Sequence, residues 1–250
     1  YEISVRDWSS DVCSSDLLIA GAAVISLVLT GCAKIDNSNP SPQQGSQQDN
    51  RAVKAGGTMR IALDGEPDKL DPSLARTLVG RNVFNAICEK LYDINEKLEI
   101  VPQLAAAAPE VSSDGMTVKI KLRTGLKFAD GNTLDATAVK TSLDRHRTIE
   151  GSQRRSELAP VKDVAVTDPA TVEIHLSQPF APLPAVLADR AGMIMSPAAV
   201  AAKGADFGTS PVCVGPYKFL MRVAQDRIEV VKDPNYYDAA KVKQIGRAHV

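Results

Sequence analysis

The side chains able to do chemistry in this sequence are few and widely separated. The chain has 250 residues, with four cysteines and three histidines. Neither a Cys-x-x-Cys nor a His-x-x-x-His pair occurs, so the spacing typical of a zinc module is missing. His146 and His175 each lack a second histidine or a carboxylate at ligand spacing. The sequence therefore predicts neither a bound metal nor a cofactor.

Hydroxyl and acidic residues also form no catalytic pattern. A Gly-x-Ser-x-Gly elbow does not occur, and the segment 208–210 (Gly-Thr-Ser) lacks its geometry. Glu66, Asp68 and Asp71 lie close together and could indicate calcium, but the two prolines of this loop favour a solvated loop. Arg154-Arg155 is interpreted as a solvated turn. We therefore expect a protein that is not an enzyme.

The overall composition excludes a nucleic-acid partner and fits a folded core. Lys and Arg number 29 against 30 Asp and Glu, a net charge of −1, whereas nucleic-acid binding usually needs a basic face. Aromatic residues make up 4%, too few for a stacking platform. Hydrophobic residues make up 44%, enough for one or two globular domains.

One cysteine, Cys32, follows an uncharged apolar run over residues 17–30. Fourteen residues are too few for a comfortable membrane span and suit the core of a signal peptide. The run leads into Leu-Thr-Gly-Cys at 29–32, which resembles the lipobox of bacterial lipoproteins. The resemblance implies a signal peptide over 1–32 and acyl chains on Cys32, which would anchor the protein to a membrane. A short buried helix with a chance cysteine is the alternative.

The polar segment 33–55 predicts a flexible tether, because it is rich in Asn, Ser, Pro, Gln and Gly. The residues before the apolar run do not suit a signal peptide, since 1–16 carry four acids and one arginine. Residues 6–16 and 245–250 resemble translated sequencing-adapter DNA. We expect 1–16 and 245–250 to be artefacts, so Trp8, Cys13 and His249 are expected to have no functional role.

Residues 56–244 alternate between strand, turn and helix patterns. Met59, Ile61 and Leu63 share one face of a predicted strand, and a helical spacing begins at about Arg81. Further elements are predicted on alternation and turn chemistry: hairpins over 110–123 and 164–176, a helix over about 136–147 capped by Asp135, a helix start at Ser196-Pro197, and two strands within 219–231. His146 is expected near the end of its helix, where a positive charge is favourable. This mixture predicts an α/β fold with a mixed sheet.

In this order the motifs resemble the peptide/nickel class of bacterial extracytoplasmic solute-binding proteins, the receptors of ABC importers. The segments that carry the resemblance are Gly56–Ala62, Leu70–Pro72, Asp114–Gly131, Pro211–Phe219 and Asp233–Tyr237. The resemblance implies the first lobe of a class II periplasmic-binding-protein-like fold, incomplete at the C-terminus. In this lobe 56–78 and about 187–244 would form the main sheet, and about 79–186 an inserted subdomain.

The resemblance also implies a function: a lipid-anchored receptor that captures di- or oligopeptides outside the cell membrane. Its partners would be the solute and the permease and ATPase subunits of the importer. Alternatives keep the fold but change the cargo to nickel chelates, haem or sugars, or replace the receptor by a lipid-anchored hydrolase or a structural envelope lipoprotein. Such receptors close two lobes over their ligand, so the 250-residue chain alone is expected to bind no peptide detectably.

Two stretches match the family's ligand-contacting positions. The resemblance implies that Thr77, Leu78 and Val79 lay backbone groups against an extended peptide, in the manner of an added strand. It also implies that the turn with Gly215 and Tyr217 approaches the cleft, because glycine permits close approach of the backbone. The alternatives are that Leu78 and Val79 only staple a helix to the sheet, and that the second stretch is an ordinary turn.

The two remaining thiols, Cys88 and Cys213, would lie in a compartment that permits disulfides. A bridge between them is one reading, and two buried free thiols are the other.

Overall fold

The computed structural model describes residues 2–5, 57–240 and 242. Cys32, the tether 33–55 and the end 245–250 lie outside the described residues, as does nearly all of the predicted signal peptide 1–32. Within the described part of the chain, no helix combines the length and apolar character needed to cross a membrane.

One sheet contains four strands in the order β2-β1-β10-β9. Their bounds are β1 Glu2–Val5, β2 Arg60–Leu63, β9 Tyr217–Val223 and β10 Arg227–Lys232. β1 runs parallel to β2 and antiparallel to β10, and β9 is antiparallel to β10, so the predicted mixed sheet is confirmed. β1 lies in the segment that the sequence predicts to be an artefact, and that origin stays a prediction.

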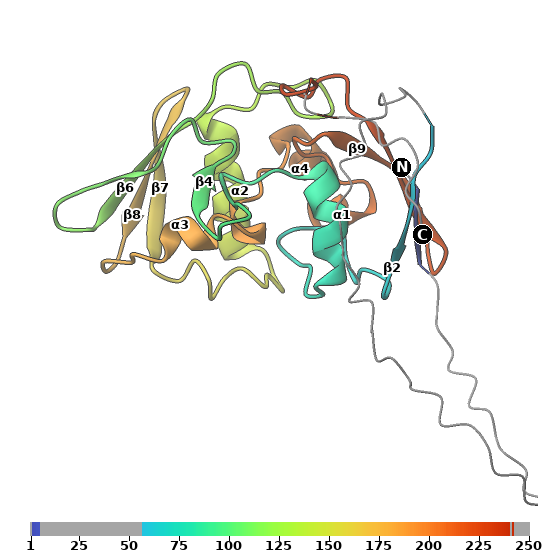
Figure 1. Cartoon of the computed structure of the whole chain (residues 1–250). Helices are drawn as coiled ribbons and strands as arrows, with labels where there is room; N and C mark the ends of the chain where they lie inside the picture. The colour runs from blue at the N-terminus through green and yellow to red at the C-terminus, as the bar shows by residue number, and fades with distance from the viewer. Residues whose placement is uncertain (1, 6–56, 241, 243–250) are drawn as a thin grey trace, which may run out of the picture. The chain divides into compact units, whose positions relative to one another are not determined.

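The second sheet is antiparallel, in the order β5-β6-β8-β7. Its strands are β5 Glu110–Val111, β6 Thr117–Lys121, β7 Val161–Asp168 and β8 Thr171–Leu176. Both predicted hairpins are confirmed, because β5 pairs with β6 and β7 pairs with β8. The alternation along β6 places Val118 and Ile120 in the core. Helix α2, Ala136–Thr148, packs against β7 and β8 (Figure 1), and the Asp135 carboxylate caps it by accepting from the Ala138 N–H at 3.0 Å.

Shorter elements complete the fold. A two-stranded sheet pairs β3, Tyr92–Ile94, with β4, Ile100–Pro102. The other helices are α1 Val79–Ile87, α3 Leu183–Val186, η1 Arg190–Gly192, α4 Pro197–Lys203 and η2 Gly204–Thr209. Ser196 caps α4 as predicted: its hydroxyl accepts from the Ala199 N–H at 3.4 Å.

Buried side chains form two hydrophobic clusters. The first lies between α2 and the antiparallel sheet, and the second between α1 and the mixed sheet. Helix α1 buries Val83, Phe84 and Ile87 in the second cluster, together with Ile228 and Val230 of β10. The apolar face of this helix therefore covers the mixed sheet. The division into a main part and an inserted part that begins near residue 79 stays a prediction.

His146 lies in the last turn of α2, as predicted, but it does not carry the positive charge expected there. The ring is fully buried and forms hydrogen-bond contacts of 2.9 Å with the Ser73 hydroxyl and 3.0 Å with the Met193 carbonyl oxygen. Burial lowers the pKa of His146 to about 4, so the ring is neutral at pH 7. Its side chain points into the core instead of toward solvent at the helix end, so the helix dipole does not decide its charge.

Candidate functional site

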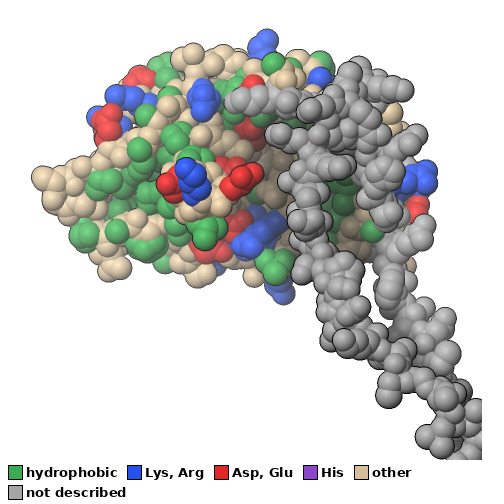
Figure 2. All heavy atoms as spheres, viewed as in Figure 1, with side chains coloured by type: hydrophobic (Ala, Val, Ile, Leu, Met, Phe, Trp, Pro, Cys, Tyr) green, Lys and Arg blue, Asp and Glu red, His purple; other side chains and the backbone are tan. Residues whose placement is uncertain are grey.

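The loop between β2 and α1 is bordered by two cavities of about 420 and 480 Å³. Both cavities are lined by Asp68, Lys69 and Leu74. Additional charged side chains line the first (Asp71, Asp206, Arg222) and the second (Arg76, Glu150). The loop therefore presents both signs of charge to space that a small solute could enter. Over the face shown in Figure 2, acidic and basic side chains are likewise interspersed.

The three acids of this loop do not converge on one point: Asp68 is exposed and Glu66 partly exposed, as expected of a solvated loop, whereas Asp71 contradicts that expectation. Glu66 accepts from Arg222 Nη2 at 2.7 Å, and this bond lowers the pKa of the Glu66 carboxyl. Asp68 accepts from the Thr77 hydroxyl at 2.9 Å and from a backbone N–H in the same loop. Asp71 is buried. Each acid thus has its own partner, and no three potential metal ligands gather anywhere among the described residues.

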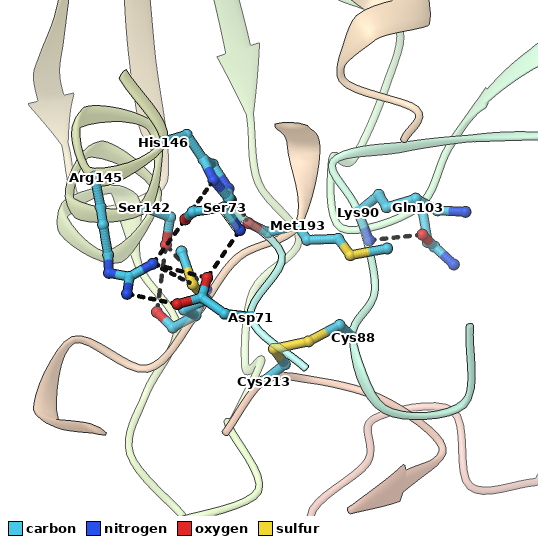
Figure 3. Close-up of a disulfide and its surroundings, with 11 residues drawn as sticks. Asp71, Ser73, Cys88, Lys90, Gln103, Ser142, Arg145, His146, Met193 and Cys213 are labelled. Atoms are coloured by element: carbon cyan, nitrogen blue, oxygen red, sulfur yellow. Dashed lines mark hydrogen bonds and ion pairs between the residues drawn. A yellow bond between two sulfur atoms is a disulfide. The ribbon is translucent and has the colours of Figure 1, made fainter. Parts of the chain in front are cut away.

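Asp71 belongs to a buried polar cluster that ties the loop to α2 (Figure 3). Arg145 donates two hydrogen bonds to the Asp71 carboxylate, at 2.9 and 2.7 Å, and a third to the Ser73 hydroxyl at 2.7 Å. Its guanidinium also lies 5.5 Å from the ring centroid of Phe207, a cation–π distance. His146 joins the cluster through Ser73. The cluster connects the loop to the helix of the antiparallel sheet.

The structure gives Thr77, Leu78 and Val79 different surroundings. Thr77 lines the second cavity, and its N–H and carbonyl are already engaged, with Asp68 at 3.4 Å and with Arg190 at 3.2 Å. Leu78 is 69% exposed, so it does not staple the helix, whereas Val79 packs on the second cluster. Strand-like pairing with a peptide stays a prediction for these residues, and at Thr77 the N–H already donates within the lobe.

Gly215 lies at the other end of α1. It is buried, and a Cβ at this position would come within 2.6 Å of the Ile87 carbonyl carbon. The backbone that requires a glycine here is therefore the end of α1. Tyr217 is half-buried against the second cluster. A nine-residue helix is about 13 Å long, so the structure does not bring Gly215 together with Thr77. A ligand contact at Gly215 or Tyr217 stays a prediction.

The structure joins Cys88 and Cys213 in a disulfide, with a Cα–Cα distance of 4.9 Å (Figure 3). Both residues are buried. Cys88 follows directly after α1, and Cys213 lies two residues before Gly215. The bridge therefore holds the C-terminal end of α1 against the segment that leads into β9.

Buried arginines are the residues that sequence reasoning missed. Arg154, predicted in a solvated turn, is 4% exposed and donates to the Ala75 carbonyl at 3.3 Å, so that prediction was wrong. Arg190 donates to the same carbonyl at 3.1 Å. Arg155 matches the expected exposure. The sequence carries no signal for this difference, because adjacent arginines look alike until the fold buries one of them.

Comparison with known proteins decides the family. The sequence model described as "Bacterial extracellular solute-binding proteins, family 5 Middle" matches residues 99–247, more than half of the chain. The chain belongs to this family. Its mixed α/β fold is that of the class II periplasmic binding proteins, as predicted.

Relatives of the family 5 chain include glutathione-binding protein GsiB of Pectobacterium atrosepticum, 33% identical over 73% of this chain and 36% of GsiB. Among solved structures, AgaA of A. tumefaciens R10 in complex with agropinic acid has 32% identity and a TM-score of 0.63, covering 70% of this chain and 35% of AgaA. The murein tripeptide binding protein MppA, in an unliganded open form, has 28% identity and a TM-score of 0.64, covering 72% of this chain and 38% of MppA.

These relatives are binding proteins and not enzymes, in agreement with the expectation from the sequence. The family 5 chain spans little more than a third of the length of each.

Proposed function

We propose that this chain is part of a receptor that captures short peptides outside the cell and delivers them to an ABC importer. The observation that carries the proposal is the relationship to GsiB, whose name states that it binds glutathione, a tripeptide. The similarity to a murein tripeptide binding protein supports the same cargo class. Capture and release require no covalent bond to be made or broken, which agrees with the absence of a catalytic motif from the sequence.

The geometry of the loop suits a zwitterionic solute. A short peptide carries an ammonium group at one end and a carboxylate at the other. Lys69 lines both cavities, while Asp206 lines the first and Glu150 the second. Charge-assisted hydrogen bonds to such termini are stronger than neutral ones. The pairing of opposite charges beside one loop therefore supports peptide binding over binding of an uncharged sugar.

The binding experiment compares the 250-residue chain with a longer protein that continues it to the full length of its relatives. Both are titrated calorimetrically with glutathione and with di- and tripeptides. The longer protein is expected to bind at least one of them at micromolar concentration, and the chain alone to show no heat of binding, because closure of two lobes supplies contacts from both sides. Failure of the longer protein to bind any peptide would contradict the proposal.

A pair of variants of the longer protein locates the site. Asp206→Asn is expected to weaken peptide binding about ten- to hundredfold, because hydrogen bonds to charged groups contribute about 1.5–3 kcal/mol and each 1.4 kcal/mol is tenfold. Glu96→Gln is the matched control, since Glu96 is exposed and lines neither cavity. Equal affinities in the two variants would place the peptide elsewhere.

A second cargo has support from the AgaA comparison, since that structure holds agropinic acid. Small acidic solutes therefore belong in the same titration. Binding of such an acid without binding of any peptide would change the proposed cargo and leave the receptor function in place.

Lipid anchoring through Cys32 completes the proposal. The lipobox-like Leu-Thr-Gly-Cys and the polar segment after it support an anchored, extracytoplasmic receptor. On expression in a bacterium with its signal peptide, the protein is expected in the membrane fraction. Cys32→Ser is expected to lose this location, whereas Cys13→Ser, the matched cysteine substitution, keeps it. Equal partitioning of both variants would exclude an anchor at Cys32.

A further inference from the structure

The segment Ala75–Thr77, here called the strap, connects the buried polar cluster to the first turn of α1. Its outer side chains, Arg76 and Thr77, line the second cavity. Its backbone is held from two directions. The N–H groups of Arg76 and Thr77 donate to the Asp68 carboxylate, at 3.0 and 3.4 Å. The carbonyls of Ala75 and Thr77 turn the other way and accept from a buried side chain.

The side chain that both carbonyls share is Arg190, while Arg154 Nη2 also donates to the Ala75 carbonyl, at 3.3 Å. Arg190 Nη1 donates to the Ala75 carbonyl at 3.1 Å and to the Thr77 carbonyl at 3.2 Å. One guanidinium nitrogen therefore bridges the two carbonyls on either side of Arg76. A change in the backbone angles at Arg76 would break one of these bonds. Arg190 thus fixes the direction in which the Arg76 side chain leaves the strap.

Arg190 is itself held rigidly. It is 5% exposed and begins the 3₁₀ turn η1. A Cβ at Gly192 would lie 1.9 Å from the Leu187 carbonyl oxygen, so this turn packs closely on the end of α3. The neighbouring Asp189 accepts from Arg81 Nε at 3.1 Å, which connects the same turn to α1. The turn η1 and the residue before it therefore contact both the strap, through Arg190, and α1, through Asp189.

We propose that Arg190 is a positioning residue for the cavity beside the strap, where it holds Arg76 and Thr77 toward an incoming solute. This inference rests on the proposed function, in which that cavity receives one charged end of a peptide. A buried arginine also needs acceptors for its own N–H groups. The bond pattern goes beyond that need, because both carbonyls belong to the strap and flank a cavity-lining residue.

The test measures amide hydrogen exchange in the full chain without ligand. Arg190→Met is expected to speed exchange of the Arg76 and Thr77 amides about tenfold, because the strap loses both bonds from Arg190, keeps only the Arg154 bond at Ala75, and opens locally at Thr77. Amides of β6 and β8 are expected to keep their wild-type rates. Arg190→Lys retains the charge and can reach one carbonyl, so an intermediate rate is expected.

Arg155→Met is the matched control. Arg155 also donates to backbone carbonyls, those of Thr148 and Ile149 at 3.3 and 3.1 Å, but it is exposed and does not touch the strap. Its replacement is expected to leave strap exchange unchanged. If Arg190→Met does not fold, the comparison is made with Arg190→Lys. Unchanged strap exchange, or an equal rise in β6 and β8, would overturn the positioning role.

Peptide titration of the longer protein then separates the two proposals. Faster strap exchange together with weaker peptide binding by Arg190→Lys supports both. If strap exchange is faster but the longer protein binds no peptide, the role of Arg190 in ordering the strap is supported. The same result contradicts peptide as the cargo. Faster exchange with unchanged peptide affinity would show that the strap is not part of the binding site.

Discussion

Replacing Arg145 by methionine is expected to lower the free energy of unfolding by about 3–5 kcal/mol, because it leaves the Asp71 carboxylate buried without its partner. Asp71 is 1% exposed and Arg145 is 8% exposed, so water cannot take over the lost hydrogen bonds. Typical domains are stable by only about 5–15 kcal/mol. This single change is therefore expected to remove a large part of the stability, as measured by urea unfolding followed by circular dichroism.

The same helix supplies the matched control. Arg147 pairs with Asp144 at 3.1 Å, but both side chains are partly exposed. Exposed pairs contribute about 0–1 kcal/mol, so Arg147→Met is expected to have a small effect. The double variant Arg145→Met/Asp71→Leu removes both charges, and is expected to recover part of the loss. Equal unfolding midpoints for Arg145→Met and Arg147→Met would refute the role assigned to the buried pair.

The elements of this fold were largely predictable, because local patterns determine them. Alternation of apolar and polar residues gave the hairpins around β6 and β8, and short polar side chains before apolar runs gave the caps at Asp135 and Ser196. The β3–β4 hairpin was missed. Its signal was present in the sequence: Tyr92 and Ile94 alternate with a polar residue, and a polar turn separates them from residues 100–102, with which they pair.

The polar contacts of the candidate site were not predictable. Arg145, Arg154 and His146 are ionisable, and such residues are usually exposed, so the sequence alone places them on the surface. Their burial depends on tertiary contacts with the loop after β2, which lies about seventy residues earlier in the chain. The separation of Thr77 from Gly215 is also tertiary, since it depends on which end of α1 each one meets. Local periodicity carries no information on either point.

Removing the Cys88–Cys213 bridge is expected to lower the free energy of unfolding by about 4–5 kcal/mol, an effect as large as that of Arg145→Met. The two cysteines are 125 residues apart, and a cross-link over so long a loop strongly reduces the conformational entropy of the unfolded chain. The comparison uses a Cys13→Ser/Cys32→Ser background, which leaves these two thiols alone. Urea unfolding of the oxidised protein is compared with that of the reduced protein and of Cys88→Ala/Cys213→Ala.

Loss of the bridge is also expected to destabilise one end of α1 more than the rest of the helix. Gly215 packs against the backbone of Ile87, one residue before Cys88, so the disulfide and the glycine hold the same end of α1. Reduction is therefore expected to speed amide exchange at residues 84–88 more than at the opposite end of the helix, which Arg81 fixes through Asp189. Two thiols that react with an alkylating reagent before any reductant is added would exclude the bridge. Unchanged unfolding midpoints after reduction would show that the packing around Gly215 suffices without it.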